Sequence, residues 1–272
     1  MKEFRGKALQ WQWQDGVVQL TLDHEPLNEI GTLLLGELET FAAAIDVLAP
    51  ITSACVIASA RPGGFCAGAD LNELYLGAIV LSEAERLDGV RKFLERIHKV
   101  FNAIDAAPFV TFAAVHGLCM GGGLELALVC DQIVADKMAR FGFPELRLGL
   151  IPGFGGIPRL RRDVGNSLIR DLLFTGRTVK SERVHQLGLV SHLAGEGYAL
   201  QVAQSMAQQV RKFDAETCRA AKKFLKPIPQ DELRKEIDLF CELFARPVVM
   251  ENLRRFVESD DPMKHLPVAE KK

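Results

Sequence analysis

Two kinds of hydrophobic periodicity alternate along the N-terminal half of the chain. Val18, Leu20 and Leu22 alternate with polar residues, which is typical of a half-buried strand. Between residues 87 and 105, apolar positions recur at spacings of three and four, the pattern of an amphipathic helix. Similar patterns predict helices over residues 33–48 and 124–130, strands over 54–58, 109–115 and 132–135, and a glycine-rich turn over 117–123. Strands that alternate with helices predict an α/β domain.

The character of the sequence changes after about Ala199, where strand patterns stop. Residues 216–224, 231–244 and 248–258 have helical periodicity and are separated by prolines. We therefore expect an α/β core that carries the site over residues 1–199 and a helical C-terminal lobe over residues 200–272. Apolar stripes in this lobe predict an oligomer, whereas packing of these stripes against the chain's own core is the alternative; they comprise Ile237, Phe240, Phe244, Val248 and Val249.

Charge and composition limit the classes of partner. The chain has 272 residues, of which 33 are Lys or Arg and 35 are Asp or Glu, so its net charge of −2 favours neither nucleic acid nor an anionic membrane. No CxxC pair or regularly spaced histidine predicts a metal site, and the cysteines are expected to be reduced. The N-terminus does not resemble a signal peptide and no membrane-length apolar run follows, so we expect a cytoplasmic protein without membrane contact.

Glycines at two strand ends suggest a ligand site. The run Gly121-Gly122-Gly123 is predicted to open a helix, where unpaired backbone N–H groups favour negative charge. It lacks the Lys-Ser/Thr of a P-loop and the spacing of a dinucleotide fingerprint, which leaves an oxyanion hole as the chemical use and close strand–helix contact as the structural one. A second turn, Phe65-Cys66-Ala67-Gly68-Ala69-Asp70-Leu71, could supply another donor, or merely place Asp70 as a helix cap.

Two glutamates lie near these glycines in the sequence. Glu125 falls in the first turn of the predicted helix, and Glu145 follows Pro144. Separately, each has a structural explanation, because a carboxylate can complement a helix dipole or cap a turn. Together, beside an oxyanion hole, they predict proton transfer between carboxyl groups and a bound substrate.

These motifs resemble the enoyl-CoA hydratase (crotonase) superfamily from about Gly16 to Pro267. The resemblance rests on the second glycine turn, on the segment from Ala114 to Ala127 and on the segment from Pro144 to Gly156. Further matches are Arg159-Leu160 with Val164-Gly165, Thr175-Gly176-Arg177 and Gly188-Leu189-Val190.

The resemblance implies a spiral of ββα units followed by helices that build a homotrimer or homohexamer, and a substrate that is an acyl-CoA thioester. It implies that the N–H groups of Ala69 and Gly122 form the oxyanion hole and that Glu125 and Glu145 are catalytic. No cofactor beyond the CoA of the substrate is implied. The remaining residues expected at the substrate or CoA are Ala67, Gly68, Asp70, Leu71, Gly121, Leu150 and Phe154, with Arg61 as a loose match to a basic residue near the CoA phosphates.

The implied reaction is the syn addition of water across the 2,3 double bond of a 2-enoyl-CoA, or its reverse. Within the enzyme class the alternative is a Δ3,Δ2-enoyl-CoA isomerase, which would use Glu145 and leave Glu125 idle. From another class, the alternatives are a non-catalytic acyl-CoA-binding protein and an RNA-binding relative. The near-neutral charge counts against RNA, and both glutamates count against a non-catalytic scaffold.

The segment from Asn72 to Asp88 is long for this family and rich in apolar residues. We expect part of it to form an apolar acyl site that favours an uncharged acyl chain, whereas packing against the core is the alternative. The expected walls comprise Leu71, Leu74, Tyr75, Leu76, Ile79, Val80 and Leu81 on one side and Leu150, Ile151 and Phe154 on the other.

Overall fold

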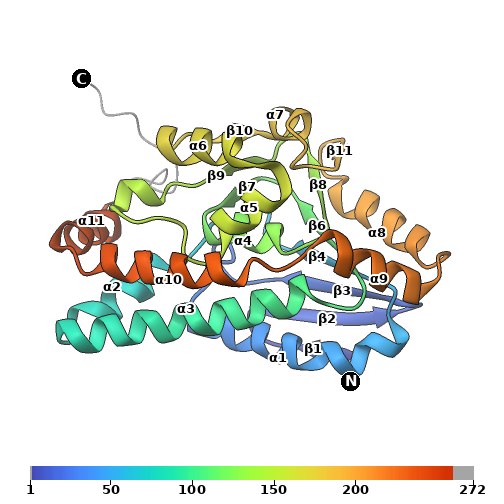
Figure 1. The fold of residues 1–272 in the computed structure, drawn as a ribbon, viewed down its shortest axis with the longest axis horizontal. Helices are drawn as coiled ribbons and strands as arrows, with labels where there is room; N and C mark the ends of the chain where they lie inside the picture. Colours follow the sequence, from blue (N-terminus) through green and yellow to red (C-terminus); the bar gives the residue numbers. More distant parts are fainter. Residues whose placement is uncertain (1, 260–272) are drawn as a thin grey trace.

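A seven-stranded sheet forms the larger of two sheets in the computed structural model, which describes residues 2–259 (Figure 1). Its strand order is β1-β2-β3-β4-β6-β8-β11; β1 to β3 pair antiparallel, and the pairs from β3 onward are parallel. The strands are β1 (Glu3–Arg5), β2 (Leu9–Gln14), β3 (Val17–Leu22), β4 (Ala54–Ser59), β6 (Val110–Val115), β8 (Gln132–Asp136) and β11 (His192–Ala194). The four strands expected from the sequence are confirmed as β3, β4, β6 and β8.

A smaller sheet of four short strands lies beside it, in the order β10-β9-β7-β5. Its members are β5 (Gly64–Cys66), β7 (Leu118–Met120), β9 (Arg140–Gly142) and β10 (Val179–Lys180). The prediction of turns at residues 64–66 and 118–120 was wrong. These segments are strands because they form parallel pairs with distant parts of the chain, β5 with β7 and β7 with β9. No local alternation of polar and apolar residues indicates this pairing.

Successive strand pairs divide themselves between the two sheets. In the pairs β4–β5, β6–β7 and β8–β9, the first strand joins the large sheet and the second joins the small sheet. A helix follows each pair, so the chain is a spiral of ββα units, and the two glycine turns follow β5 and β7, which are neighbours in the small sheet. The two turns therefore end side by side.

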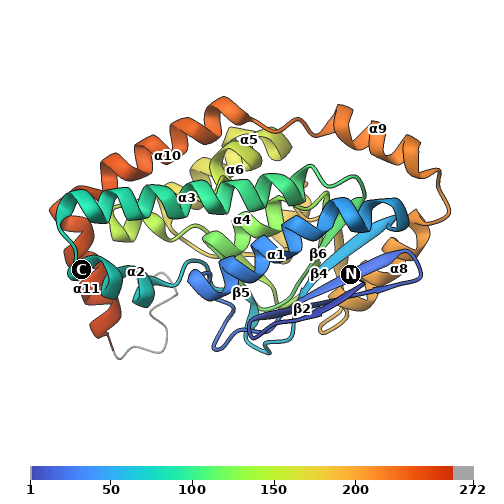
Figure 2. The same cartoon turned by 90° about the horizontal axis from the view of Figure 1, so that it is seen from below.

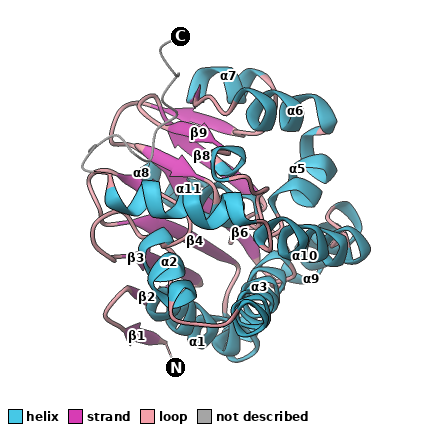
Figure 3. Cartoon of the chain, turned by 90° about the vertical axis from the view of Figure 1, so that its left-hand side faces the viewer, coloured by secondary structure: helices cyan, strands magenta, loops and turns pink. Residues whose placement is uncertain are grey.

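Helices cover both faces of the large sheet. The core helices are α1 (Thr32–Leu48), α2 (Leu71–Ile79), α3 (Glu83–Asp105), α4 (Gly122–Leu128), α5 (Gly156–Val164), α6 (Asn166–Thr175) and α7 (Ser181–Gln186), with short 3-10 turns η1 (Ala49–Ile51) and η2 (Glu145–Leu148). α3 begins with a capping box between Ser82 and Glu85 and packs on α1, with its apolar stripe buried (Figures 2 and 3). The opposite face of the sheet is covered by α8 (Ala199–Val210), through Ala199, Ala203 and Ala207.

The remaining helices are α9 (Ala215–Leu225), α10 (Gln230–Phe244) and α11 (Pro247–Glu258). α10 packs along α3, and α11 packs on α2 (Figure 2). Ile237, Phe240, Phe244 and Val249 are buried within the chain, and of the expected stripe only Val248 is exposed. The alternative explanation is therefore correct for this stripe, and the oligomer remains a prediction that the stripe does not support.

Near its two ends, the chain differs in part from the elements predicted from the sequence. The strands β1 and β2 were not expected, although Leu9 and Trp11 alternate with polar residues and are buried. The division expected at residue 199 falls at the first residue of α8, a helix that packs on the sheet. Pro267, where the family resemblance ends, lies outside the described residues.

Candidate active site

The two glycine turns bring the backbone of Ala69 close to the start of α4. A Cβ atom added to Gly122 would lie 3.4 Å from the Ala69 nitrogen and 2.6 Å from the ring of Phe154. Ile30 forms a bridge with the second turn: its N–H donates to the Gly68 oxygen, and its oxygen accepts from the Asp70 N–H. The Ala69 N–H takes no part in these bonds. Gly122 is the first residue of α4, where N–H groups have no intrahelical partner. This arrangement offers two backbone donors to one oxygen atom.

These donors border a cavity of about 310 Å³. Of the residues that the family resemblance implied for catalysis or for substrate and CoA binding, all except Arg61 line it. Arg61 instead forms ion pairs with Asp23 and with Glu25, the latter at 2.9 Å. Asp70 both lines the cavity and caps α2, because its side chain accepts a hydrogen bond from the Glu73 N–H at 2.9 Å.

Glu125 is held by the first turn of α5 and the residues before it. Its Oε1 accepts hydrogen bonds from the N–H groups of Phe154 at 2.8 Å and Gly156 at 2.7 Å. Its side chain is buried, 1% exposed. Burial raises the pKa of Glu125 to about 7, although the two N–H groups and the charge of Arg159 act in the opposite direction. Glu125 can therefore gain and lose a proton near neutral pH.

Glu145 has a different environment across the same cavity. It begins η2, and its Oε2 is buried without a hydrogen-bond partner in the part of the chain that the structure describes. A Cβ at Gly121, where φ is +48°, would lie 2.5 Å from the Glu145 Oε1, so glycine makes room for this carboxyl group. Burial and the charge of Glu125 raise the pKa of Glu145 well above 4.5. Glu145 is thus suited to carry a proton while Glu125 is ionised.

A third buried glutamate, Glu236 on α10, was missed by the sequence analysis. Its carboxyl group accepts hydrogen bonds from the N–H groups of Gly155 at 2.6 Å and Ile157 at 3.2 Å. Along residues 154–157, Glu125 therefore accepts hydrogen bonds from the first and third N–H groups, and Glu236 accepts them from the second and fourth. Burial and the charge of Glu125 raise the pKa of Glu236. A signal existed, because Glu236 shares a helix face with Leu233 and Phe240, both buried.

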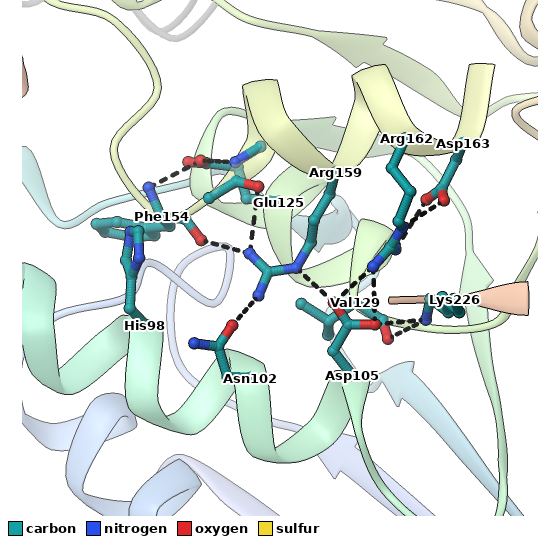
Figure 4. A network of polar contacts seen from close by, with 12 residues as sticks. His98, Asn102, Asp105, Glu125, Val129, Phe154, Arg159, Arg162, Asp163 and Lys226 are labelled. Atoms are coloured by element: carbon teal, nitrogen blue, oxygen red, sulfur yellow. Dashed lines mark hydrogen bonds and ion pairs between the residues drawn. The ribbon is translucent and has the colours of Figure 1, made fainter. Parts of the chain in front are cut away.

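The carbonyl groups of the same segment are held by Arg159, which is fully buried (Figure 4). Arg159 donates to the oxygens of Phe154 at 3.3 Å and Gly155 at 3.2 Å and forms an ion pair with Asp105 at 2.7 Å. Lys226 and Arg162 also pair with Asp105, and despite burial these cations lower the pKa of Asp105. The segment that carries the Glu125 hydrogen bonds is thus fixed on both its N–H and its carbonyl sides.

The expected apolar wall is only partly correct. Leu71, Leu74 and Leu81 line the cavity together with Leu150 and Phe154. Three other members of the segment are at least half exposed and do not line it: Leu76, Ile79 and Val80. Tyr75 and Ile151 do not line it either, because they pack partly buried against the core. Leu76 and Ile79 are exposed because α2 lies at the surface, with only Ala78 of its residues buried, and Val80 directly follows this helix.

Residues 2–259 contain no cluster of three or more side chains suited to hold a metal ion. Within the same residues, no helix is long and apolar enough to cross a membrane.

The chain is similar in sequence and in fold to known proteins. A family model described as enoyl-CoA hydratase/isomerase matches residues 12–264. An enoyl-CoA isomerase/hydratase of Mycosarcoma maydis is 38% identical over 176 residues, which span 64% of this chain and 61% of that protein. A probable mitochondrial enoyl-CoA hydratase of Arabidopsis thaliana is 33% identical over 255 residues, covering 91% of this chain and 81% of that protein. The crystal structure of an enoyl-CoA hydratase from Bacillus halodurans superposes with a TM-score of 0.81 at 25% identity, over 91% of this chain and 99% of that one. The expected fold class is thereby confirmed.

Proposed function

Because the chain belongs to the enoyl-CoA hydratase/isomerase family, we propose that it hydrates the 2,3 double bond of a 2-enoyl-CoA thioester. The observation that supports hydration is a pair of buried carboxyl groups, Glu125 and Glu145, on one cavity with different environments. Two such groups suit a reaction that removes one proton from water and delivers another to carbon.

In the proposed mechanism, the N–H groups of Ala69 and Gly122 bind the thioester oxygen. The Glu125 carboxylate takes a proton from water as the water oxygen bonds to C3, and the π electrons move toward the thioester to give an enolate. The two N–H groups stabilise the enolate oxygen, and the loss of one such donor typically costs about 10²–10³ in rate. Protonated Glu145 then delivers its proton to C2. The proton on Glu125 returns to Glu145 through water before the next turnover.

The partners of each carboxyl group favour this division of roles. Glu125 accepts two backbone hydrogen bonds at 2.7 and 2.8 Å, which stabilise its ionised form as a base. Glu145 Oε2 has no partner within residues 2–259, which favours the neutral acid. An isomerase needs only one carboxyl group to move a proton along the acyl chain, so the hydrogen bonds at Glu125 favour hydration.

Turnover of crotonyl-CoA tests the proposal. We expect the absorbance of the conjugated enoyl thioester to fall and 3-hydroxybutyryl-CoA to appear, as identified by chromatography against a standard. A parallel assay with 3-hexenoyl-CoA measures isomerisation. Isomerisation without hydration of any 2-enoyl-CoA would replace the proposed function by the isomerase alternative, and binding without turnover would support the non-catalytic alternative.

A further inference from the structure

Within residues 2–259, one arginine that lines the cavity has no partner for its side chain. Arg86 lies in the first turns of α3 and lines the cavity, and its Nε is buried without a hydrogen-bond acceptor. The other two arginines of α3 are paired, Arg91 with Asp238 at 2.9 Å and Arg96 with Glu39 at 2.8 Å. Within residues 2–259, no hydrogen bond or ion pair of the Arg86 side chain is formed. A buried donor without an acceptor is costly, so this site is suited to an anion from outside the chain.

The acidic residues closest to Arg86 in sequence are bound to other groups. Glu85 forms the capping box with Ser82, and Asp88 pairs with Lys92 at 2.7 Å. Glu73, which also lines the cavity, accepts hydrogen bonds from the Thr32 N–H at 3.0 Å. These bonds leave the guanidinium of Arg86 as a cation in a cavity whose surroundings are largely apolar.

Two helical glycines leave open space beside Arg86. Gly77 in α2 and Gly89 in α3 both line the cavity, and a Cβ atom at either would meet nothing within 4 Å. A glycine inside a helix costs about 1 kcal/mol relative to alanine. Both glycines are exposed, so tight packing does not account for either, and the cavity is open to solvent at this end, between α2 and α3.

A single face of α3 connects the reacting atoms with Arg86. Phe93 on this face contacts Phe154 at 6.0 Å between ring centroids, and the Phe154 ring lies against Gly122. Gly89 and Val90 follow one turn away, and Arg86 follows two turns away. At 1.5 Å per residue the distance from Phe93 to Arg86 along the helix is about 10 Å. An acyl chain that starts at Gly122 and passes Phe154 and Phe93 can end at Arg86.

We infer that Arg86 forms an anion subsite at the far end of the acyl site and that it binds a carboxylate carried on the acyl chain of the thioester. This inference rests on the proposed function for the position of the thioester. It replaces the uncharged acyl chain that the sequence pattern favoured. The near part of the cavity, with Leu74, Phe93 and Phe154, contacts the methylene groups, and Arg86 contacts the terminal carboxylate by a charge-assisted hydrogen bond.

Binding of saturated thioesters tests the subsite without requiring turnover. Titration calorimetry would compare hexanoyl-, octanoyl- and decanoyl-CoA with the thioesters of the corresponding terminal dicarboxylic acids. We expect at least one dicarboxylic thioester to bind about tenfold more tightly than the neutral thioester of the same length, in the range of hydrogen bonds to charged groups. Arg86→Gln should abolish this preference. Lys92→Gln is the matched control, because Lys92 is on the same helix, pairs only with Asp88 and does not line the cavity.

Three results would overturn the inference: tighter binding of the neutral thioester at every length, a preference that persists in Arg86→Gln, or an equal loss for both thioesters in Arg86→Gln. The last would assign Arg86 to the phosphates of CoA. Hydration assays with the matching 2-enoyl thioesters separate this inference from the proposed function. Preferential binding without hydration contradicts the function and leaves the subsite intact, whereas hydration without the preference does the reverse.

Discussion

The two sides of the cavity present the same residue type in contrasting environments. On one side, Glu125 accepts two backbone hydrogen bonds from the start of α5, which Glu236 and Arg159 hold in place. On the other side, Glu145 begins a 3-10 turn, and its buried Oε2 has no hydrogen-bond partner among the described residues. Glu125 is buried and Glu145 is half-buried with its Oε2 fully buried, and desolvation raises the pKa of both, so desolvation alone does not distinguish them.

The two glutamates differ in the groups that offset the effect of burial on their pKa. Backbone donors and a nearby arginine keep the pKa of Glu125 near 7, whereas the pKa of Glu145 is raised by burial and further by the charge of Glu125. Two carboxyl groups that repel each other as anions tend to hold one proton between them at neutral pH, and the proposed mechanism assigns that proton to Glu145. The contrast teaches that two residues of the same type on one cavity can differ in proton affinity through their hydrogen-bond partners, and the proposed acid and base roles rest on that difference.

Substitution of either glutamate should have the largest effect. We expect Glu145→Gln and Glu125→Gln each to lower kcat for hydration by about 10²–10⁴, the usual contribution of a general acid or base. Glutamine preserves volume, and in Glu125→Gln the amide oxygen can keep both backbone hydrogen bonds. Thermal unfolding and binding of hexanoyl-CoA serve as controls for folding. Hydration within a few-fold of wild type in either folded variant would remove that residue from the mechanism.

The pH profile should show which carboxyl group carries the proton. If ionised Glu125 is the base, kcat/KM falls about tenfold per pH unit below a midpoint close to 7 and rises toward a plateau above it. At higher pH it falls again as Glu145 loses its proton, because the pKa of Glu145 is also raised. A profile that stays flat between pH 5 and 8 would contradict the assignment of Glu125 as the base.

Much of this site could be predicted from the sequence because its motifs are local. The glycines of both turns and the two glutamates lie in short segments, and the order of strands and helices brings these segments together. The α/β class followed from periodicity, because the buried strands and amphipathic helices of the core keep a regular pattern.

Features that depend on distant contacts were missed. The short strands β5, β7, β9 and β10 are held by one another rather than by local propensity. Glu236 and Arg86 belong to segments assigned from the sequence to an oligomer lobe and an apolar wall. Their roles depend on the packing of α10 and α3 next to the cavity, and the composition of these segments does not predict that packing.

Truncation of Glu236 tests how the Glu125 side of the cavity is held. We expect Glu236→Ala to lower kcat about tenfold, because the freed N–H groups of Gly155 and Ile157 allow the donors to Glu125 to move, and displacements below 1 Å affect catalysis. Glu236→Gln should recover only part of the loss, because each Glu236 oxygen accepts one of the two N–H bonds and the glutamine amide has a single oxygen to accept with. Equal activity of wild type and Glu236→Ala would show that Arg159 alone positions the segment.

The smallest expected effect is on the pH dependence of stability, which depends on the proton that Glu145 holds in the folded protein. The folded-state pKa of Glu145 lies above the unfolded value of 4.5, so above pH 4.5 the folded protein holds a proton that the unfolded chain releases. The contribution of Glu145 to stability therefore falls as pH rises, by at most about 1.4 kcal/mol per pH unit until the folded pKa is passed. Glu145→Gln lacks this loss, so we expect its unfolding temperature to rise relative to wild type by a few degrees between pH 6 and pH 8.5.

Glu251→Gln is the matched control, because hydrogen bonds from Arg254 and Arg255 lower the pKa of Glu251 to about 2, and both its folded and its unfolded pKa lie below this range. The temperature difference between Glu251→Gln and wild type should thus stay constant. A constant difference for Glu145→Gln as well would mean that Glu145 is already ionised at pH 6, and the contrast with Glu125 would be lost.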